Sequence, residues 1–315
     1  MRTSFYYQSM PEQGASQQMG MTASRLATRR AMSGSAFVAP GVLWVLVFTI
    51  FPLLYTLFMS LHSTTLSGSK FVGLRNFQQL FADYRFWSAV RVTLIFAAVS
   101  VTATVLLGVV LALAFNRGGR GARAFRTMSI LPMFAAPIAL GYLGLTIFYE
   151  QGGPVNNLLS AIGLAQVPWL SNGSWALVSV LAVDVWQWTP FVFLVVLAAL
   201  QSVPLELYEV AELETSSGRK VLRWITLPLI RGPLGTVIIL RIVEAFKVFD
   251  IPFTLTNGGP GIATRSLTYN VYVVALRNQN FGYSASMAVI LLALVLVVAM
   301  VFFRFYGNMY DEERR

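Results

Sequence analysis

The stretch Leu207–Pro228, LYEVAELETSSGRKVLRWITLP, decides how the whole chain is interpreted, because it is a polar segment between two strongly apolar ones. Together with Glu206 it holds four of the chain's 13 acidic residues within nine positions, and it turns basic from Arg219 onward. Most of the remaining sequence is apolar enough to cross a membrane, or short enough to connect two such crossings. We therefore expect Leu207–Pro228 to be a loop of a membrane protein that a soluble partner can bind.

The composition indicates an all-α polytopic membrane protein. Of the 315 residues, 56% are hydrophobic and 11% are charged, whereas about a quarter of the residues of a soluble domain are charged. The mean hydropathy is +0.66. Lipid offers no hydrogen bonds to the backbone, so apolar segments of this length are expected to cross the membrane as helices.

The charge and the rare residue types exclude several other classes. The formal net charge is +10, but there is no Lys/Arg-rich run with interleaved aromatic residues, so we expect no nucleic-acid partner. The chain has no cysteine, which excludes disulfides and thiolate metal sites. Its single histidine, His62, ends the first apolar run. A metal site needs several donors, so we interpret His62 as an interfacial residue and expect no bound metal.

The apolar runs predict six membrane-spanning helices of about 20 residues each. Residues 1–34 are polar and are expected to form a largely flexible cytoplasmic tail. The run that follows is too long for a signal peptide. Residues 35–306 then form the transmembrane domain, and residues 307–315 form a cytoplasmic C-terminal tail. The spans are placed near residues 37–61, 92–115, 127–148, 175–200, 234–255 and 284–305.

The distribution of Lys and Arg predicts which side of the membrane each loop faces. With six spans, both termini and the polar loop at 204–228 lie on one side, which carries 15 of the 23 basic residues. The other side carries six, and Arg241 and Lys247 lie within the fifth span. Cytoplasmic loops are enriched in basic residues. Both termini and the loop are therefore expected in the cytoplasm.

The fifth predicted span contains four charges at a spacing of three, in the sequence LRIVEAFKVFD of residues 240–250. Side chains three positions apart can meet on a helix, so each successive pair of opposite charges is a candidate ion pair. The row of four charges nevertheless winds around the helix, so no single face of the helix carries all of them. Each charge at the centre of a span costs about 2.5–3.5 kcal/mol. This helix is therefore expected deep in a bundle, beside a water-filled cavity, or partly outside the hydrocarbon.

The fourth predicted span adds polar groups in the sequence VDVWQWTPF of residues 183–191. Intramembrane polar groups mark a solute path, or they pair with one another and fix the orientation of the helices. For any one of them we consider pairing the better explanation, whereas for the group as a whole we favour a path. The candidate path residues are Asp184, Gln187, Trp188, Glu244, Lys247 and Asp250.

The sequence carries no recognised catalytic or nucleotide-binding motif. A GxxxxGK[ST] phosphate loop is absent, so the chain is not expected to bind a nucleotide in that manner. There is neither an HExxH nor a GxSxG motif, and the single histidine leaves no catalytic triad. The sequence therefore predicts a transporter subunit rather than an enzyme, with no cofactor of its own.

The polar loop is predicted to form two short helices separated by a turn. Pro204 suits the start of a helix, and the acidic residues of the first turns favour the positive end of the helix dipole. Thr215-Ser-Ser-Gly218 breaks the first helix, and Arg219–Ile225 resumes a helical pattern. A connector that is merely solvated has little reason to expose Val221, Leu222 and Trp224.

The same residues resemble a known motif. Tyr208-Glu209-Val210-Ala211 and Ile225-Thr226-Leu227-Pro228 resemble, at matching spacing, the Glu-Ala-Ala…Gly…Ile-x-Leu-Pro loop of permease subunits of binding-protein-dependent ABC importers. Glu214 and Thr215 stand where this family usually has Asp and Gly. Stretches such as Asp184–Phe191 and Leu255–Pro260 are similar to the carbohydrate branch of the family, the relatives of the maltose and glycerol-3-phosphate permeases. The resemblance covers roughly residues 36–306.

The resemblance implies a type I ABC importer permease fold with six transmembrane helices and a cytoplasmic coupling helix. It implies a place in the bacterial or archaeal cytoplasmic (inner) membrane. The implied partners are a second homologous permease, two ABC ATPase subunits that use ATP and Mg, and an extracytoplasmic binding protein that delivers a carbohydrate. The alternatives are an ion-coupled secondary transporter and a structural membrane subunit.

Within the coupling loop, the resemblance and the apolar pattern together assign residues that contact the ATPase. Glu209 is expected to be the main electrostatic anchor, and the packing is expected from apolar side chains of the second helix. The assigned residues are Glu209, Ala211, Glu214, Thr215, Gly218, Val221, Leu222, Trp224, Leu227 and Pro228.

Overall fold

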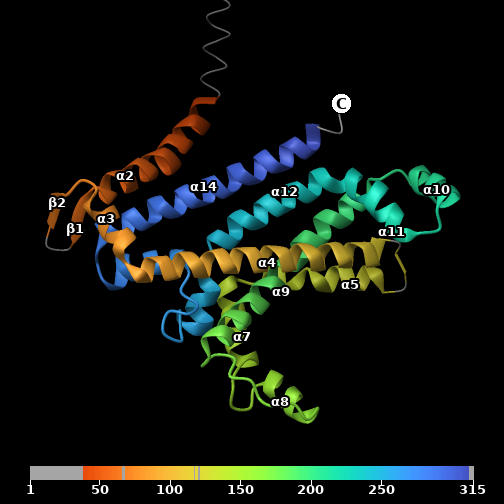
Figure 1. Cartoon of the computed structure of the whole chain (residues 1–315), viewed down its shortest axis with the longest axis horizontal. Coiled ribbons are helices and arrows are strands. Elements are labelled where there is room, and N and C mark those ends of the chain that lie inside the picture. Colours follow the sequence, from red (N-terminus) through yellow and green to blue (C-terminus); the bar gives the residue numbers. More distant parts are fainter. Residues whose placement is uncertain (1–37, 66–67, 117, 120, 312–315) are drawn as a thin grey trace, which may run out of the picture. The chain divides into compact units, whose positions relative to one another are not determined.

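A computed structural model describes residues 38–65, 68–116, 118–119 and 121–311 (Figure 1). The predicted N-terminal tail, residues 1–34, lies outside the described residues, as do residues 312–315 of the predicted C-terminal tail. The described chain is mostly helical, and the all-α prediction is confirmed. Residues 38–56 belong to one unit of the chain, and Leu57 onward belongs to a second.

Among the described residues, five helices are long and apolar enough to cross a membrane, and a sixth crossing is a bent pair of helices. The six predicted spans are confirmed in number when this pair is counted as one span. The crossings are Val38–Ser60, α4 (Tyr84–Asn116), the bent pair Ala122–Phe134 with Pro137–Ile147, α9 (Gly173–Gln201), Gly218–Phe246 and Phe281–Tyr306.

The first crossing contains a π-helical turn, η1 (Leu46–Ile50), followed by α2 (Phe51–Ser60). Proline lacks the N–H that a regular helix uses and clashes with the preceding turn. The wider π-helical turn precedes Pro52, so the helix continues through this proline.

In the second unit, α4 and α9 lie side by side along much of their length, and α12 (Leu227–Phe246) packs against both (Figure 1). Gly108 allows the close approach of α4 to α9. A Cβ atom there would lie 2.6 Å from the Cβ atom of Val192 and 2.9 Å from the backbone nitrogen of Phe193. The apolar core forms along these contacts, with Val192, Val196 and Val237 fully or almost fully buried.

The third crossing is broken, contrary to the continuous helix predicted near 127–148. It consists of α5 (Ala122–Ser129), α6 (Leu131–Phe134) and α7 (Pro137–Ile147), with a bend of 102° before α7. Ala135 and Ala136 are both extended. Ala136 directly precedes Pro137, and such a residue is disfavoured in the helical region. A proline expected inside one helix therefore begins a second helix.

The fifth crossing ends earlier than predicted. Helix α12 stops at Phe246, Lys247 is its C-terminal cap, and helical structure resumes before η3 (Pro252–Thr256). Pro252 cannot donate to the carbonyl of Val248. Ser266 Oγ donates to that carbonyl at 2.7 Å, and Thr268 Oγ1 donates to the carbonyl of Phe246 at 3.2 Å. The continuous helix predicted to residue 255 is therefore wrong, and side chains satisfy the carbonyls that the break leaves free.

The polar loop is also more continuous than predicted. Helix α10 (Leu205–Glu214) ends at an extended Thr215, as the sequence predicts. Then α11 (Gly218–Val221), a π-helical turn η2 (Leu222–Thr226) and α12 follow one another as one helix from Gly218 to Phe246. The prediction of a separate short second helix is wrong: Pro228 lies inside this continuous helix, and the wider π-helical turn η2 precedes it, as η1 precedes Pro52.

Short elements close the end of the bundle opposite to α10 (Figure 1). The strands β1 (His62–Thr65) and β2 (Gly68–Phe71) form an antiparallel hairpin that the sequence did not predict. Asn76 of α3 (Arg75–Ala82) donates to the carbonyls of Ser60 and His62 and ties the hairpin to the helices. The remaining elements are α8 (Pro154–Ala161), α13 (Leu267–Tyr272), η4 (Val273–Arg277) and α14 (Phe281–Asp311).

Candidate functional site

A buried ion pair joins two of the crossings. Arg241 on α12 and Asp184 on α9 are joined by a distance of 2.8 Å between Arg241 Nη2 and Asp184 Oδ2. The two side chains are 1% and 4% exposed. Removing a charge from water costs several kcal/mol, so such a pair needs good geometry and further hydrogen bonds.

Helix α4 supplies those hydrogen bonds. The hydroxyl of Ser100 donates to Asp184 Oδ2 and accepts a bond of 2.7 Å from Arg241 Nη2. One turn further on, Thr104 Oγ1 accepts a weaker bond of 3.4 Å from Arg241 Nε. The guanidinium carbon also lies 5.1 Å from the centre of the Trp188 ring, within the range of a cation–π interaction. One arginine therefore joins α4, α9 and α12.

One part of this arginine is not satisfied. Arg241 Nη1 is buried and has no hydrogen-bond partner among the described residues. Unpaired buried donors are rare and costly, about 1–3 kcal/mol each. The contacts of Arg241 therefore leave one of its N–H groups uncompensated.

The structure brings together some of the predicted path residues and separates others. Asp184 and Gln187 are buried, at 3% and 4% exposure, and Trp188 is half-buried. Glu244 and Lys247 form a second ion pair of 2.8 Å, whose side chains are 40% and 56% exposed. Asp250 is half-buried beyond the break in the fifth crossing. Of the three ion pairs that the spacing suggested, the structure forms one, and Arg241 turns to Asp184 instead of Glu244.

Sequence reasoning missed Ser100 and Thr104. Both lie on α4, which is otherwise strongly apolar, and they are four residues apart, so they share one face. A buried arginine requires acceptors beyond its counter-ion, and this is the signal that could have identified the two hydroxyls. Their partner could not be identified, because it lies 137 to 141 residues away in the sequence.

The turn between α10 and α11 does not need a glycine. Thr215 has φ −151° and ψ 135°, an extended conformation that any residue adopts. Its hydroxyl accepts a hydrogen bond of 3.2 Å from the backbone N–H of Ser217, a local bond that favours turns. A threonine at the position where the resembling family has glycine is therefore compatible with this loop.

The surface of α10 is unusually apolar for a polar loop. Ala211 is buried, whereas Val210 is 57% and Leu213 is 88% exposed. Glu209 and Glu214 are also exposed, and Trp224 beyond the turn is 73% exposed. Val221 and Leu222 are half-buried, so of the three apolar side chains predicted to be exposed, only Trp224 stands out from the surface.

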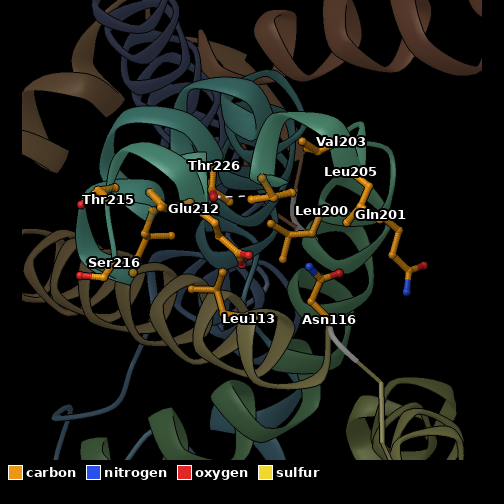
Figure 2. A pocket seen from close by; sticks show the side chains of 14 residues that line it. Leu113, Asn116, Leu200, Gln201, Val203, Leu205, Glu212, Thr215, Ser216 and Thr226 are labelled. Carbon is orange, nitrogen blue, oxygen red and sulfur yellow. Dashed lines mark hydrogen bonds between the residues drawn. The ribbon is translucent and has the colours of Figure 1, made fainter. Parts of the chain in front are cut away.

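A hollow of about 930 Å³ lies between this loop and the ends of α4 and α9. Figure 2 shows Glu212 reaching into the hollow from α10, with Leu113 and Asn116 of α4 opposite. Val221 and Leu222 are part of its lining. Across its inner side, Thr226 Oγ1 donates to the Tyr208 hydroxyl at 3.4 Å. The loop therefore rests on the bundle through few contacts around an open space.

The segment between α7 and α9 is held by two polar side chains. The carboxylate of Glu150 accepts bonds of 2.7 Å from the backbone N–H groups of Leu170 and Ser171. These bonds to the charged form hold the pKa of Glu150 below its ordinary value. Asn156 Oδ1 accepts from the backbone of Val167 and from Trp169 Nε1. The segment predicted as a loop therefore has a defined fold around α8.

Comparison with known proteins gives a consistent result. Residues 104–311 match the family described as binding-protein-dependent transport system inner membrane component. The chain is 36% identical over 280 residues to the trehalose/maltose transport system permease protein MalF of Thermococcus litoralis, with 88% of this chain and 93% of that protein covered. It is 32% identical to the sn-glycerol-3-phosphate transport system permease protein UgpA of Agrobacterium fabrum, with 85% and 92% covered.

A third relative and a solved structure cover even more of the chain. The trehalose transport system permease protein SugA of Mycobacterium tuberculosis is 30% identical, with 95% of this chain and 96% of that protein covered. A bacterial ABC transporter involved in the import of the acidic polysaccharide alginate has a chain of the same fold. It matches with a TM-score of 0.79 and 23% identity, over 90% of this chain and 99% of that chain.

Proposed function

The chain belongs to the family of binding-protein-dependent transport system inner membrane components, and from this we propose that it is the permease subunit of an ABC importer for a carbohydrate-like solute. Its family consists of transporter subunits rather than enzymes. The observation that carries the substrate class is the set of relatives, which are named for the transport of trehalose, maltose and glycerol 3-phosphate. These solutes are small and rich in hydroxyl groups.

The partners in this proposal are a second homologous permease, two ABC ATPase subunits and an extracytoplasmic binding protein. In this proposal the ATPase subunits bind ATP and Mg. The sequence of this chain has no phosphate loop that would hold the nucleotide in their place. In this proposal the chain lies in the bacterial or archaeal inner membrane with both termini and α10 on the cytoplasmic side, which the distribution of basic residues supports. The binding protein then delivers the solute at the end that carries the β1–β2 hairpin.

The exposed side of α10 is the surface that contacts the ATPase in this proposal. Val210 and Leu213 offer apolar area that water would otherwise cover, and Trp224 extends it beyond the turn. Glu209 supplies a charge beside them. The continuous helix from Gly218 to Phe246 begins at the turn after α10, carries Trp224, and runs into the interior of the bundle, so a movement of this surface passes through the turn into one long helix.

The solute path in this proposal follows the partly exposed polar groups. Trp188, Glu244, Lys247 and Asp250 are accessible or half-buried, and they combine an aromatic face with charged hydrogen-bonding groups, which suits a hydroxyl-rich solute. Asp184 and Gln187 lie behind them and support them from within the bundle.

The proposal is tested by reconstituting the chain with its partners in proteoliposomes. Glu209→Lys is expected to abolish both uptake and the ATP hydrolysis stimulated by the loaded binding protein, without preventing membrane insertion. Gln151→Lys, an added charge in the exposed segment before α8, is the matched control and is expected to behave as the native chain. Normal uptake by Glu209→Lys would count against docking through α10.

Energy coupling separates this function from ion-coupled transport. We expect uptake to require the ATPase subunits and to persist when the proton gradient is collapsed. Uptake that continues without the ATPase and stops when the gradient collapses would contradict the proposal and support a secondary transporter.

A further inference from the structure

The contacts of Arg241 with Asp184, Ser100 and Thr104 are called the junction below. The junction lies far along the helix that begins at the turn after α10. Gly218 and Arg241 are separated by 23 residues of one continuous helix, which is about 35 Å at 1.5 Å per residue. Arg241 is followed by only five further residues before this helix ends at Phe246. A displacement of the helix at the turn therefore reaches Arg241 before it reaches the break in the fifth crossing.

Other contacts of this helix with its neighbours are of a different kind. Ile230 and Val237 are buried and pack in an apolar cluster with residues of α9 such as Val196. Apolar contact is non-directional, so it tolerates sliding and rotation of one helix along another. The contacts of Arg241 are directional, because its guanidinium has a fixed donor geometry.

The junction also resists separation more strongly than an apolar contact does. If α12 moved away from α9, both Arg241 and Asp184 would remain buried without a counter-ion, and such a state is strongly unfavourable. The bonds to Ser100 and Thr104 add α4 to the same unit.

We infer that Arg241 is a positioning residue through which the Gly218–Phe246 helix moves α4 and α9 together, so that the coupling of ATP hydrolysis to uptake depends on its junction with Asp184. The inference rests on the proposed function, because it needs an ATPase that acts on α10. It assigns Arg241 no contact with the solute. Its consequence is that α9 and α12 keep their mutual distance near this junction throughout the transport cycle.

The test uses the complete importer with the double substitution Asp184→Leu and Arg241→Met. Both charges are removed together, because an apolar replacement of a buried ion pair is often neutral for stability, whereas removal of one partner is not. We expect an assembled transporter that still hydrolyses ATP in response to the loaded binding protein. The amount of solute taken up per ATP is expected to fall about tenfold or more, a size typical of coupling between sites.

Two further variants show whether the effect belongs to the junction. Val237→Ala removes apolar contact on the same helix and is expected to leave the ratio of uptake to hydrolysis unchanged, even if it lowers stability. Arg241→Lys keeps the charge but loses the planar fork, and is expected to give an intermediate ratio. An unchanged ratio in the assembled double variant would overturn the inference. Absence of ATP-driven uptake by the native importer would instead contradict the proposed function.

A spectroscopic measurement decides the matter even if the double variant does not assemble. The chain has no cysteine, so Trp186→Cys on α9 and Leu240→Cys on α12, both exposed positions, can carry a pair of spin labels. We expect the same distance distribution in the nucleotide-free and the ATP-bound importer. A distribution that shifts between these two states would show that α9 and α12 move separately, and would overturn the inference.

Discussion

Two ion pairs lie close together near the end of α12, and they have the same N–O distance of 2.8 Å. The pair between Arg241 and Asp184 is 1% and 4% exposed, whereas the pair between Lys247 and Glu244 is 56% and 40% exposed. The first links helices that are distant in the sequence, and the second links neighbours three residues apart. The comparison shows that equal geometry can serve two different purposes, and that burial decides which one.

Burial acts through the solvation of the charges. In a buried pair, each charge depends on the other, so the loss of one partner leaves the second uncompensated. In an exposed pair, water solvates the remaining charge, and the pair contributes little. The predictions below test this difference with substitutions ordered by the size of the expected effect.

The largest effect is expected from Asp184→Asn, which leaves Arg241 buried without a counter-ion. The free energy of unfolding should fall by about 3–5 kcal/mol, measured by denaturation in mixed micelles and followed through the fluorescence of the chain's seven tryptophans. The double substitution Asp184→Leu with Arg241→Met is the control and should be much closer to the native chain. A single substitution that proves as mild as the double one would contradict the comparison.

A smaller effect is expected from Ser100→Ala, which leaves both ions in place and removes the hydroxyl between them. The free energy of unfolding should fall by about 1–3 kcal/mol, because Arg241 Nη2 and Asp184 each lose one buried hydrogen bond. Ser286→Ala is a matched control: Ser286 is equally buried, but its hydroxyl bonds the carbonyl of Tyr283 in its own helix. If both variants lost the same stability in the same assay, the ions would not depend on Ser100.

Glu150 extends the comparison to a carboxylate that backbone N–H groups satisfy instead of a cation. Its lowered pKa means that its stabilisation is complete above the pKa in the unfolded chain, about 4.3, and is lost as the pH falls through the folded pKa. The protection factors of the Leu170 and Ser171 amides, which compare exchange with the intrinsic rate at each pH, should therefore fall as the pH drops through the folded pKa. At neutral pH, Glu150→Gln should cost about 1 kcal/mol, since the site is partly exposed, and should remove the pH dependence. A native chain with no such pH dependence would contradict the assignment.

Much of the architecture could be predicted, because the length of an apolar run is a local property. The runs around α9 and α14 give their extents to within a few residues at most ends. The turn at Thr215 follows from a local cluster of small polar residues. The bend before Pro137 and the break before Pro252 involve prolines that the sequence shows plainly. Whether a proline kinks a helix, begins one or ends one depends on which other groups satisfy the freed carbonyls.

The partners of the site residues could not be predicted either, because they too depend on groups that are distant in the sequence. The spacing of Arg241, Glu244 and Lys247 allows two ion pairs within one helix, and only contact with α9 determines that Arg241 pairs with Asp184. The hairpin at His62–Phe71 depends on Asn76 in the next helix. A sequence pattern therefore identifies the charges that must be compensated, whereas the three-dimensional packing selects the groups that compensate them.

The smallest effect on stability is expected from Glu244→Gln, which breaks the exposed pair on the same helix. The free energy of unfolding should change by about 0.2–1 kcal/mol, and this difference should shrink as the salt concentration rises, because mobile ions screen exposed charges. Lys247→Gln should give the same small change, and the two substitutions combined should cost little more than either alone. The measurement is the unfolding assay used for Asp184→Asn, repeated at low and high salt.

The same measurement at low and high salt also shows whether water or lipid surrounds Glu244 and Lys247. If the pair faced lipid, neither water nor salt would reach it, and breaking it would be as costly as breaking the buried pair. A small, salt-dependent change would show that the pair is in contact with water although it lies near the end of a membrane-spanning helix, as the proposed solute path requires. A large change that is independent of salt would remove both residues from that path, and the contrast between the two ion pairs would then be one of position rather than of solvation.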